Sequence, residues 1–227
     1  KKDPKGKIGL LVDEWGTWWD EEPGTIPGHL YQQNALRDAF VAALSLNVFH
    51  KYTDRVKMAN IAQVVNVLQS MILTDQEGTG HMVLTPTYWV FQMYTPFQEA
   101  TYLPVDLESE TIQCSTEYFK EKQKTADNTT RPCPLLSASA AKTTDGGIVL
   151  ALTNVSLDKA QTVDFNLEGY NAKTVSGRIL TSKNVADFND FKNPNVIAPK
   201  EYKDAKLKKN VLSVKIPAKS IIVLNIK

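Results

Sequence analysis

The sequence predicts an α/β segment followed by an all-β segment that folds as an antiparallel β-sandwich. Up to about residue 97, short apolar runs alternate with stretches of helical periodicity, which is typical of β–α units. After Pro96, short runs of alternating and β-branched residues are separated by turn signals such as Asp145-Gly146-Gly147, which is typical of a sandwich. We therefore place a boundary near residue 98, between a first domain at 1–97 and a second at 98–227.

The first domain contains two predicted strands and two predicted helices. The continuous apolar run Ile8–Val12 predicts a parallel strand covered on both faces. Apolar positions recur at helical spacing over Leu30–His50 and predict a helix. The segment Val56–Val65 fits a buried strand or part of a helix, and its context favours the strand. The pair Thr85-Pro86 has the pattern of an N-cap and a first helical residue, so a helix is predicted from there to Tyr94.

The second domain is predicted as a series of short strands joined by turns. We expect these strands near Ala100–Leu107, Leu135–Ala141, Gly147–Asn154, Gln161–Leu167, Thr174–Leu180, Val211–Ile216 and Ser220–Ile226.

Composition and charge argue against two classes of protein. The chain has 26 Lys and Arg residues against 25 Asp and Glu residues, and it has no long basic stripe, so no nucleic-acid partner is expected. Its apolar stretches fall far short of the roughly 20 residues that a membrane-spanning helix needs, so no membrane insertion is expected. The first residues, KKDPKGK, lack the apolar region of a signal peptide, and none is expected in this sequence.

The cysteine and histidine patterns predict no metal site and no cofactor. Cys114 and Cys133 could close a disulfide around the polar segment 118–131, or they could remain two ordinary thiols. An oxidised pair would favour a periplasmic or extracellular parent protein, and localisation is otherwise open. The three histidines lack metal-ligand spacing. No GxGxxG, P-loop or GxSxG motif occurs.

The stretch LLVDEWGTWW, from Leu10 to Trp19, combines an acid with aromatic residues. It delivers Glu14 at the end of a predicted parallel strand and surrounds it with Trp15, Trp18 and Trp19. In α/β barrels these strand ends carry the chemistry. A carboxylate there can attack an electron-poor sugar carbon, while aromatic faces cover the C–H face of the ring. The structural alternative is that the acid caps a loop or pairs with an arginine and the tryptophans belong to the core.

Four sequence blocks carry a resemblance to a known family. They are VDEWGTWW from Val12, NALRDA from Asn34 with AALSLNVFH from Ala42, MANIAQVVNVL from Met58, and LTPTY from Leu84. In this order and spacing they resemble the last part of an α-L-arabinofuranosidase of glycoside hydrolase family 51. The resemblance is close over residues 8–107 and looser over the sandwich. It implies that the first domain is the C-terminal part of a (β/α)8 TIM barrel, with Glu14 after the seventh strand.

The resemblance implies a catalytic role for Glu14. The glutamate of the DEW motif is the nucleophile of a retaining mechanism in this family, and its acid/base partner is a glutamate in an upstream Asn-Glu pair. No Asn-Glu pair occurs in the 227 residues. A complete barrel needs about 250 residues, whereas about a hundred precede the sandwich. We therefore expect a C-terminal fragment, with little or no glycosidase activity of its own.

The parent protein is accordingly predicted to be a retaining exo-α-L-arabinofuranosidase that acts on terminal arabinofuranosyl residues of plant polysaccharides and oligosaccharides. The resemblance implies no cofactor and is compatible with a homo-oligomer. A second hypothesis is a structural or carbohydrate-binding β-sandwich module without a catalytic role. A third is a xylanase or endoglucanase of a related barrel clan, against which the block Asn60-Ile61-Ala62-Gln63 argues.

Overall fold

The structure is a computed structural model that describes residues 3, 5–75, 77–114 and 130–227. Its helical elements are α1 (Leu36–Lys51), α2 (Pro86–Tyr94) and the short 3-10 helix η1 (Thr95–Phe97). Its strands are β1 (Leu10–Trp15), β2 (Val56–Ile61), β3 (Ile72–Thr74), β4 (Met82–Leu84), β5 (Thr101–Leu103), β6 (Thr111–Cys114), β7 (Arg131–Pro134), β8 (Leu136–Lys142), β9 (Ile148–Asn154), β10 (Gln161–Asn166), β11 (Val175–Thr181), β12 (Lys200–Glu201), β13 (Ala205–Lys208), β14 (Val211–Ile216) and β15 (Ser220–Ile226).

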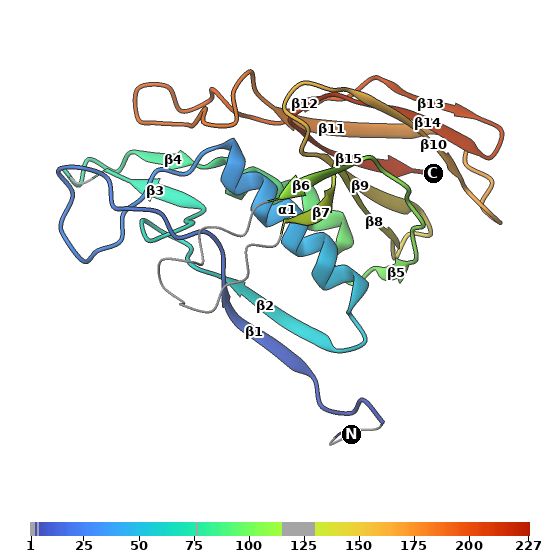
Figure 1. The fold of residues 1–227 in the computed structure, drawn as a ribbon, viewed down its shortest axis with the longest axis horizontal. Helices are drawn as coiled ribbons and strands as arrows, with labels where there is room; N and C mark the ends of the chain where they lie inside the picture. Colours follow the sequence, from blue (N-terminus) through green and yellow to red (C-terminus); the bar gives the residue numbers. More distant parts are fainter. Residues whose placement is uncertain (1–2, 4, 76, 115–129) are drawn as a thin grey trace.

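Two antiparallel sheets form the body of the molecule (Figure 1). Within the described residues, the large sheet has the strand order β12-β11-β15-β9-β8-β5 and the small sheet the order β10-β14-β13. The helices contact the face of the large sheet that is turned away from the small sheet: α1 packs on β8 and β9, and α2 on β11 and β15. The predicted antiparallel β-sandwich is thereby confirmed, and helices cover it on one side.

The large sheet is buried on both faces, as β15 shows. Ile221 and Val223 join the apolar core between this sheet and the helices, whereas Ile222 and Leu224 join the core between the two sheets. All four are at most 3% exposed. Alternate residues of a strand point to opposite faces, so a strand covered on both faces needs apolar residues throughout. This accounts for the continuous apolar run Ile221–Leu224 within β15.

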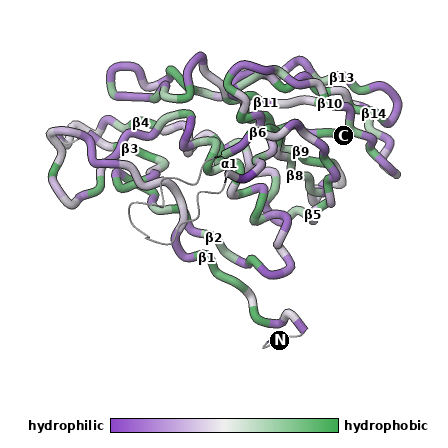
Figure 2. The backbone as a smooth tube through the Cα atoms, in the orientation of Figure 1, coloured by the Kyte–Doolittle hydropathy of each residue, from purple (hydrophilic) through white to green (hydrophobic). Residues whose placement is uncertain are grey.

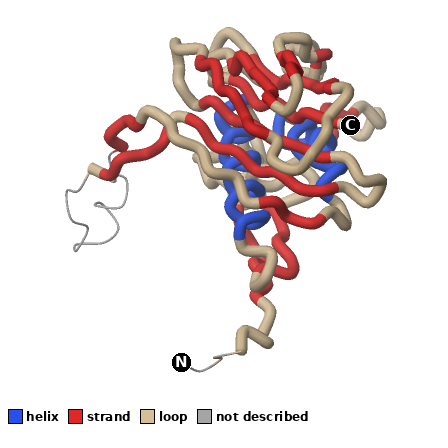
Figure 3. Tube along the Cα trace, turned by 90° about the vertical axis from the view of Figure 1, so that its right-hand side faces the viewer, coloured by secondary structure: helices blue, strands red, loops and turns tan. Residues whose placement is uncertain are grey.

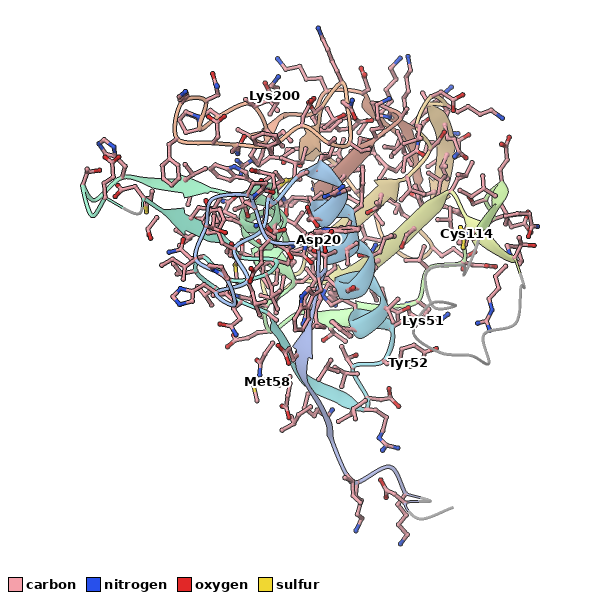
Figure 4. The ribbon with its side chains drawn as sticks, turned by 60° about the vertical axis from the view of Figure 1, so that its left-hand side comes forward. Asp20, Lys51, Tyr52, Met58, Cys114 and Lys200 are labelled. Atoms are coloured by element: carbon pink, nitrogen blue, oxygen red, sulfur yellow. The ribbon has the colours of Figure 1, made fainter. Side chains whose placement is uncertain are left out.

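The parallel pair β1–β2 projects from the body (Figure 2), and several of its apolar residues are exposed. Leu10 and Leu11 are each 51% exposed, and Met58 on β2 is 48% exposed with its side chain pointing outward (Figure 4). The prediction of a strand covered on both faces is therefore wrong for the chain as described. The physical reason is that β1 and β2 pair only with each other among the described residues.

The boundaries of several predicted elements also differ. The first strand begins at Leu10, and the first helix begins at Leu36 because Leu30 has a positive φ of 55° and Ala35 forms a β-bridge with Phe188. The strand interpretation of Val56–Val65 is confirmed over Val56–Ile61. The helix from Pro86 to Tyr94 is confirmed in full.

Several strands were not predicted from the sequence: β3, β4, β6, β7, β12 and β13. Strands β6 and β7 pair antiparallel and extend from the body (Figure 3). Cys114 and Cys133 lie on these two strands and are both free thiols. Most of the segment that a disulfide between them would enclose lies outside the described residues.

The structure also bears on membrane-spanning helices and on metal-binding groups. No helix in the described part of the chain is long and apolar enough to cross a membrane. Across residues 3, 5–75, 77–114 and 130–227, no group of three or more His, Cys, Asp and Glu side chains is placed to hold a metal ion.

Candidate active site

Glu14 lies one residue before the end of β1, in an irregular part of the parallel pair. Val12 is paired with Ala59 and Trp15 with Ile61, so β1 contains one more residue than β2 over this interval. Such a bulge re-aims a side chain, and bulges are common beside active sites. Glu14 itself is exposed. The structure therefore places the predicted acid in a bulge at the carboxyl end of a parallel strand.

Gly16 lets the chain turn immediately after β1. Its φ of +142° belongs to the region that favours glycine. A Cβ atom at this position would lie 3.2 Å from Gln69 Oε1 and 3.3 Å from Gln69 Cβ. Any other residue would combine an unfavourable backbone conformation with crowding against Gln69. Glycine is therefore required for the segment after Glu14 to approach this buried glutamine.

Trp15 anchors the end of β1 on the helices. Its ring contacts Phe49 of α1 edge-on, with 5.3 Å between ring centroids, and stacks on Phe91 of α2 at 6.1 Å. It packs against the apolar core that the helices share with the large sheet. The structure thus gives Trp15 a packing role, and the predicted contact of Trp15 with substrate stays a prediction.

Asp38 of α1 connects the start of the helix to the segment after Glu14. Its Oδ1 atom accepts hydrogen bonds from Thr17 Oγ1 and from Trp19 Nε1, both at 2.7 Å, and its Oδ2 atom accepts one from the backbone N–H of Ala35 at 2.7 Å. The side chain of Asp38 is fully buried. Asp38 thus ties the segment after Glu14 to the residue that precedes α1.

Two buried glutamines complete the same network. Gln69 Oε1 accepts a hydrogen bond from the backbone N–H of Thr17 at 2.9 Å, and its amide nitrogen donates to the Asp38 carbonyl at 2.6 Å. Gln32 Oε1 accepts one from the backbone N–H of Trp19 at 2.9 Å. These two glutamines are at most 1% exposed. The backbone on both sides of residue 18 is therefore held by side chains from distant parts of the chain.

Trp18 and Trp19 differ in their exposure and in their contacts with other residues. Trp19 is 39% exposed, and the guanidinium of Arg37 lies 4.2 Å from the centroid of its ring in a cation–π contact. Trp18 is 63% exposed and presents an open aromatic surface. Glu14, Trp18 and Trp19 lie on one short segment of the chain, and their roles toward substrate stay predictions.

Sequence reasoning missed Asp38, Gln32 and Gln69. Asp38 is the third residue of a helix, where an acid can accept from the backbone N–H of the residue before the helix, so a capping pattern could have indicated it. No local pattern marks the two glutamines, which lie in irregular segments.

The loop after Trp19 is braced by its own acids. Glu21 accepts hydrogen bonds from the backbone N–H groups of Gly28 at 2.9 Å and Leu30 at 2.8 Å, and Glu22 accepts one from Gln33 at 3.1 Å. Burial raises the pKa of the nearby Tyr31 phenol, and the negative charge of Glu22 raises that pKa further. These contacts fold residues 21–33 into a defined loop beside the segment that carries Trp18.

Comparison with known proteins agrees with the sequence blocks. The family model of the α-L-arabinofuranosidase C-terminal domain matches residues 13–220. The chain belongs to this family. An intracellular exo-α-L-arabinofuranosidase from Bacteroides ovatus is 56% identical to it over 226 residues, which are 100% of this chain and 41% of that protein. The resemblance to the C-terminal portion of a family 51 arabinofuranosidase is thereby confirmed.

Solved structures show the same relationship. The crystal structure of the GH51 arabinofuranosidase from Xanthomonas axonopodis pv. citri superimposes with a TM-score of 0.88 at 42% identity, covering 99% of this chain and 42% of that one. A thermostable GH51 α-L-arabinofuranosidase from Thermotoga petrophila superimposes with a TM-score of 0.77 at 24% identity, covering 96% of this chain and 43% of that one, which shows the fold alone. The chain thus spans less than half the length of these arabinofuranosidases.

One expectation is contradicted by these relatives. The preference for a periplasmic or extracellular location conflicts with the Bacteroides ovatus arabinofuranosidase, which is named intracellular. That preference depended on a disulfide between Cys114 and Cys133, and both cysteines are free thiols.

Proposed function

We propose that the parent protein is a retaining exo-α-L-arabinofuranosidase in which Glu14 is the nucleophile. The observation that carries this proposal is the position of Glu14, exposed in a bulge at the carboxyl end of a parallel strand, in a chain of this family. The 56% identity to a named exo-α-L-arabinofuranosidase supports the reaction class. The proposed substrates are terminal α-L-arabinofuranosyl residues of plant polysaccharides and oligosaccharides.

In the proposed mechanism, the ionised Glu14 carboxylate attacks the anomeric carbon as the bond from that carbon to the leaving oxygen breaks. A second carboxylic acid gives its proton to the leaving oxygen. It then takes a proton from the water that hydrolyses the glycosyl-enzyme, so the product keeps its anomeric configuration. The exposed ring of Trp18 would cover the C–H face of the sugar, with Trp19 beside it.

The second carboxyl group is proposed to come from a part of the parent protein outside these residues. In retaining enzymes the two carboxyl groups lie roughly 5–5.5 Å apart. The Asn-Glu pair that the family resemblance calls for is absent from the 227 residues. The chain alone is therefore expected to show no turnover.

We further propose that β1, β2, α1 and α2 are the last part of a (β/α)8 barrel and that residues 98–227 form an accessory sandwich domain. The parallel pairing of β1 with β2, with α1 between them in the chain, supports the barrel. Further barrel strands would cover Leu10 and Leu11, which are half exposed. The large sheet is covered on both faces, which disfavours a sugar-binding face on it.

The test is hydrolysis of a nitrophenyl α-L-arabinofuranoside by the parent protein and its Glu14→Gln variant. We expect the variant to lose activity by on the order of 10³-fold or more, because the covalent step needs the carboxylate. The matched control is Asp20→Asn, which neutralises an exposed acid six residues further on and should leave turnover unchanged. NMR of the first sugar released should show retention. Normal turnover by Glu14→Gln, or an inverted product, would refute the proposal.

A further inference from the structure

In the segment Trp15–Trp19, every residue except Trp18 is fixed by packing, by a turn or by a hydrogen bond. Trp15 is packed against Phe49 and Phe91, and Gly16 makes the turn. Thr17 and Trp19 are both hydrogen-bonded to the buried Asp38. Trp18 lies between these two and is 63% exposed.

The Asp38 carboxylate is the group that Thr17 and Trp19 share. One oxygen, Oδ1, accepts from both side chains at 2.7 Å, so these residues cannot move independently of each other. Its other oxygen accepts from the Ala35 N–H, and the guanidinium of Arg37 lies 3.9 Å from that oxygen. Because the carboxylate is 0% exposed, water does not replace a lost partner at this point.

We propose that Asp38 is a positioning residue for the glycosidase reaction. It fixes the backbone on both sides of Trp18 and thereby sets where this aromatic surface stands relative to Glu14. Asp38 does not touch the sugar in this scheme, and it acts through Thr17 and Trp19. The inference rests on the proposed function, because it assigns Trp18 to the sugar ring and Glu14 to the anomeric carbon.

A positioning residue matters here because nucleophilic attack on a carbon requires close alignment of the two reacting groups. A nucleophile and a substrate held in near-attack geometry react far faster than loosely held ones, and a shift of about 1 Å in their relative position can cost roughly 100-fold in rate. Trp18 has no hydrogen bond of its own from the indole nitrogen among the described residues. Its position therefore depends on the residues that flank it.

The experiment uses the full-length parent protein with two kinds of variant. Asp38→Asn keeps the shape, but the amide nitrogen cannot accept, so either Ala35 N–H or the Thr17 and Trp19 donors lose their acceptor. Thr17→Val removes the hydroxyl, which donates to Asp38 and accepts from Gln32 Nε2 at 3.2 Å, and it leaves the helix untouched. Thr17→Ser retains the hydroxyl and is its conservative partner. Asp145→Asn is the matched control, because Asp145 accepts from Thr143 Oγ1 and Lys227 Nζ in the turn between β8 and β9, and neither partner belongs to α1 or to residues 14–19.

We expect Asp38→Asn and Thr17→Val each to lower kcat/KM by about tenfold or more. Thr17→Ser should stay close to wild type, and the double variant should lose less than the sum of the two single losses, because Thr17 and Asp38 share a hydrogen bond. Asp145→Asn should lower the melting temperature without changing kcat/KM. In a Glu14→Gln background, calorimetry with an arabino-oligosaccharide should show weaker binding, by about tenfold, when Asp38→Asn is added.

Three results would overturn the role of Asp38. They are unchanged kcat/KM in a folded Asp38→Asn or Thr17→Val protein, losses that add in the double variant, and an equal loss of kcat/KM in Asp145→Asn. If Asp38→Asn does not fold, the comparison of Thr17→Val with Thr17→Ser decides the question. Failure of the proposed function is distinguishable, since the wild-type parent would then not hydrolyse arabinofuranosides, or Glu14→Gln would retain turnover.

Discussion

Acidification from neutral pH to about pH 4 is expected to destabilise the protein through His50, near the end of α1. The ring of His50 stacks on Phe97 with 4.4 Å between centroids, and its Nδ1 atom lies 3.0 Å from Ser139 Oγ on the large sheet. Burial lowers the pKa of His50 from 6.5 to about 4. A helix C-terminus would favour the charged imidazolium, but here desolvation outweighs that attraction.

The sign and size of the effect follow from the two pKa values. In the unfolded chain His50 binds a proton near pH 6.5, whereas in the folded protein it does so only near pH 4. The free energy of unfolding therefore falls as the pH drops through this window, and His50 adds no pH dependence above or below it. At ~1.36 kcal/mol for each unit of pKa difference, the upper limit is ~3.4 kcal/mol. Partial exposure of the ring reduces the expected loss to about 2 kcal/mol.

Urea unfolding at a series of pH values measures this loss. Comparison with His50→Gln isolates it, because glutamine cannot take up a proton in this range and can still bond to Ser139. The difference between wild type and His50→Gln should change by about 2 kcal/mol between neutral pH and pH 4. His29→Gln, at an exposed loop position, is the matched control and should show no such change. A wild-type to His50→Gln difference that does not vary with pH would refute the reasoning.

Two further predictions concern local packing. Thr85→Ala should lower the free energy of unfolding by about 1–2 kcal/mol, because Thr85 Oγ1 accepts from Tyr88 N at the start of α2 and donates to the buried Ser70 carbonyl at 2.8 Å. Thr85→Ser should recover most of the loss in the same urea titration. Gly177→Ala should cost about 1–3 kcal/mol, because the new Cβ would lie 2.4 Å from Leu224 Cδ2. A thermal melt that matches the exposed control Ser176→Ala would contradict this.

Elements with strong local signals could be predicted from the sequence. The helix that begins at Pro86 was found from its N-cap, and β14 and β15 were found with their observed ends. The strand Ala205–Lys208 was missed because its sequence, AKLK, has alternating lysines and a single large apolar residue. Strand β13 lies at an edge of the small sheet, where charged residues are favoured and β-propensity is a weak guide. Its pairing with β14, rather than its composition, makes it a strand.

In the candidate site too, some residues could be predicted from the sequence and others could not. Glu14 and the three tryptophans follow one another in a short motif, so the sequence alone could single them out. Asp38 reaches Trp19 over 19 residues and Gln69 reaches Thr17 over 52, and each resembles an ordinary polar residue in its own neighbourhood. Only tertiary structure shows that they are buried. The buried residues that support the site are therefore harder to predict from the sequence than its exposed glutamate.

The sandwich contributes to the position of Glu14 through Trp15. The ring of Trp15 lies on the apolar core between the helices and the large sheet, and this core includes Ile221 and Val223 of β15. Protein interiors are close-packed, so a change of volume in such a core is transmitted to its neighbours rather than absorbed. A cavity made at Val223 would thus loosen α1 and α2, and with them the end of β1. The residues that hold Glu14 in place consequently extend beyond the first 97 residues, into the strands of the large sheet.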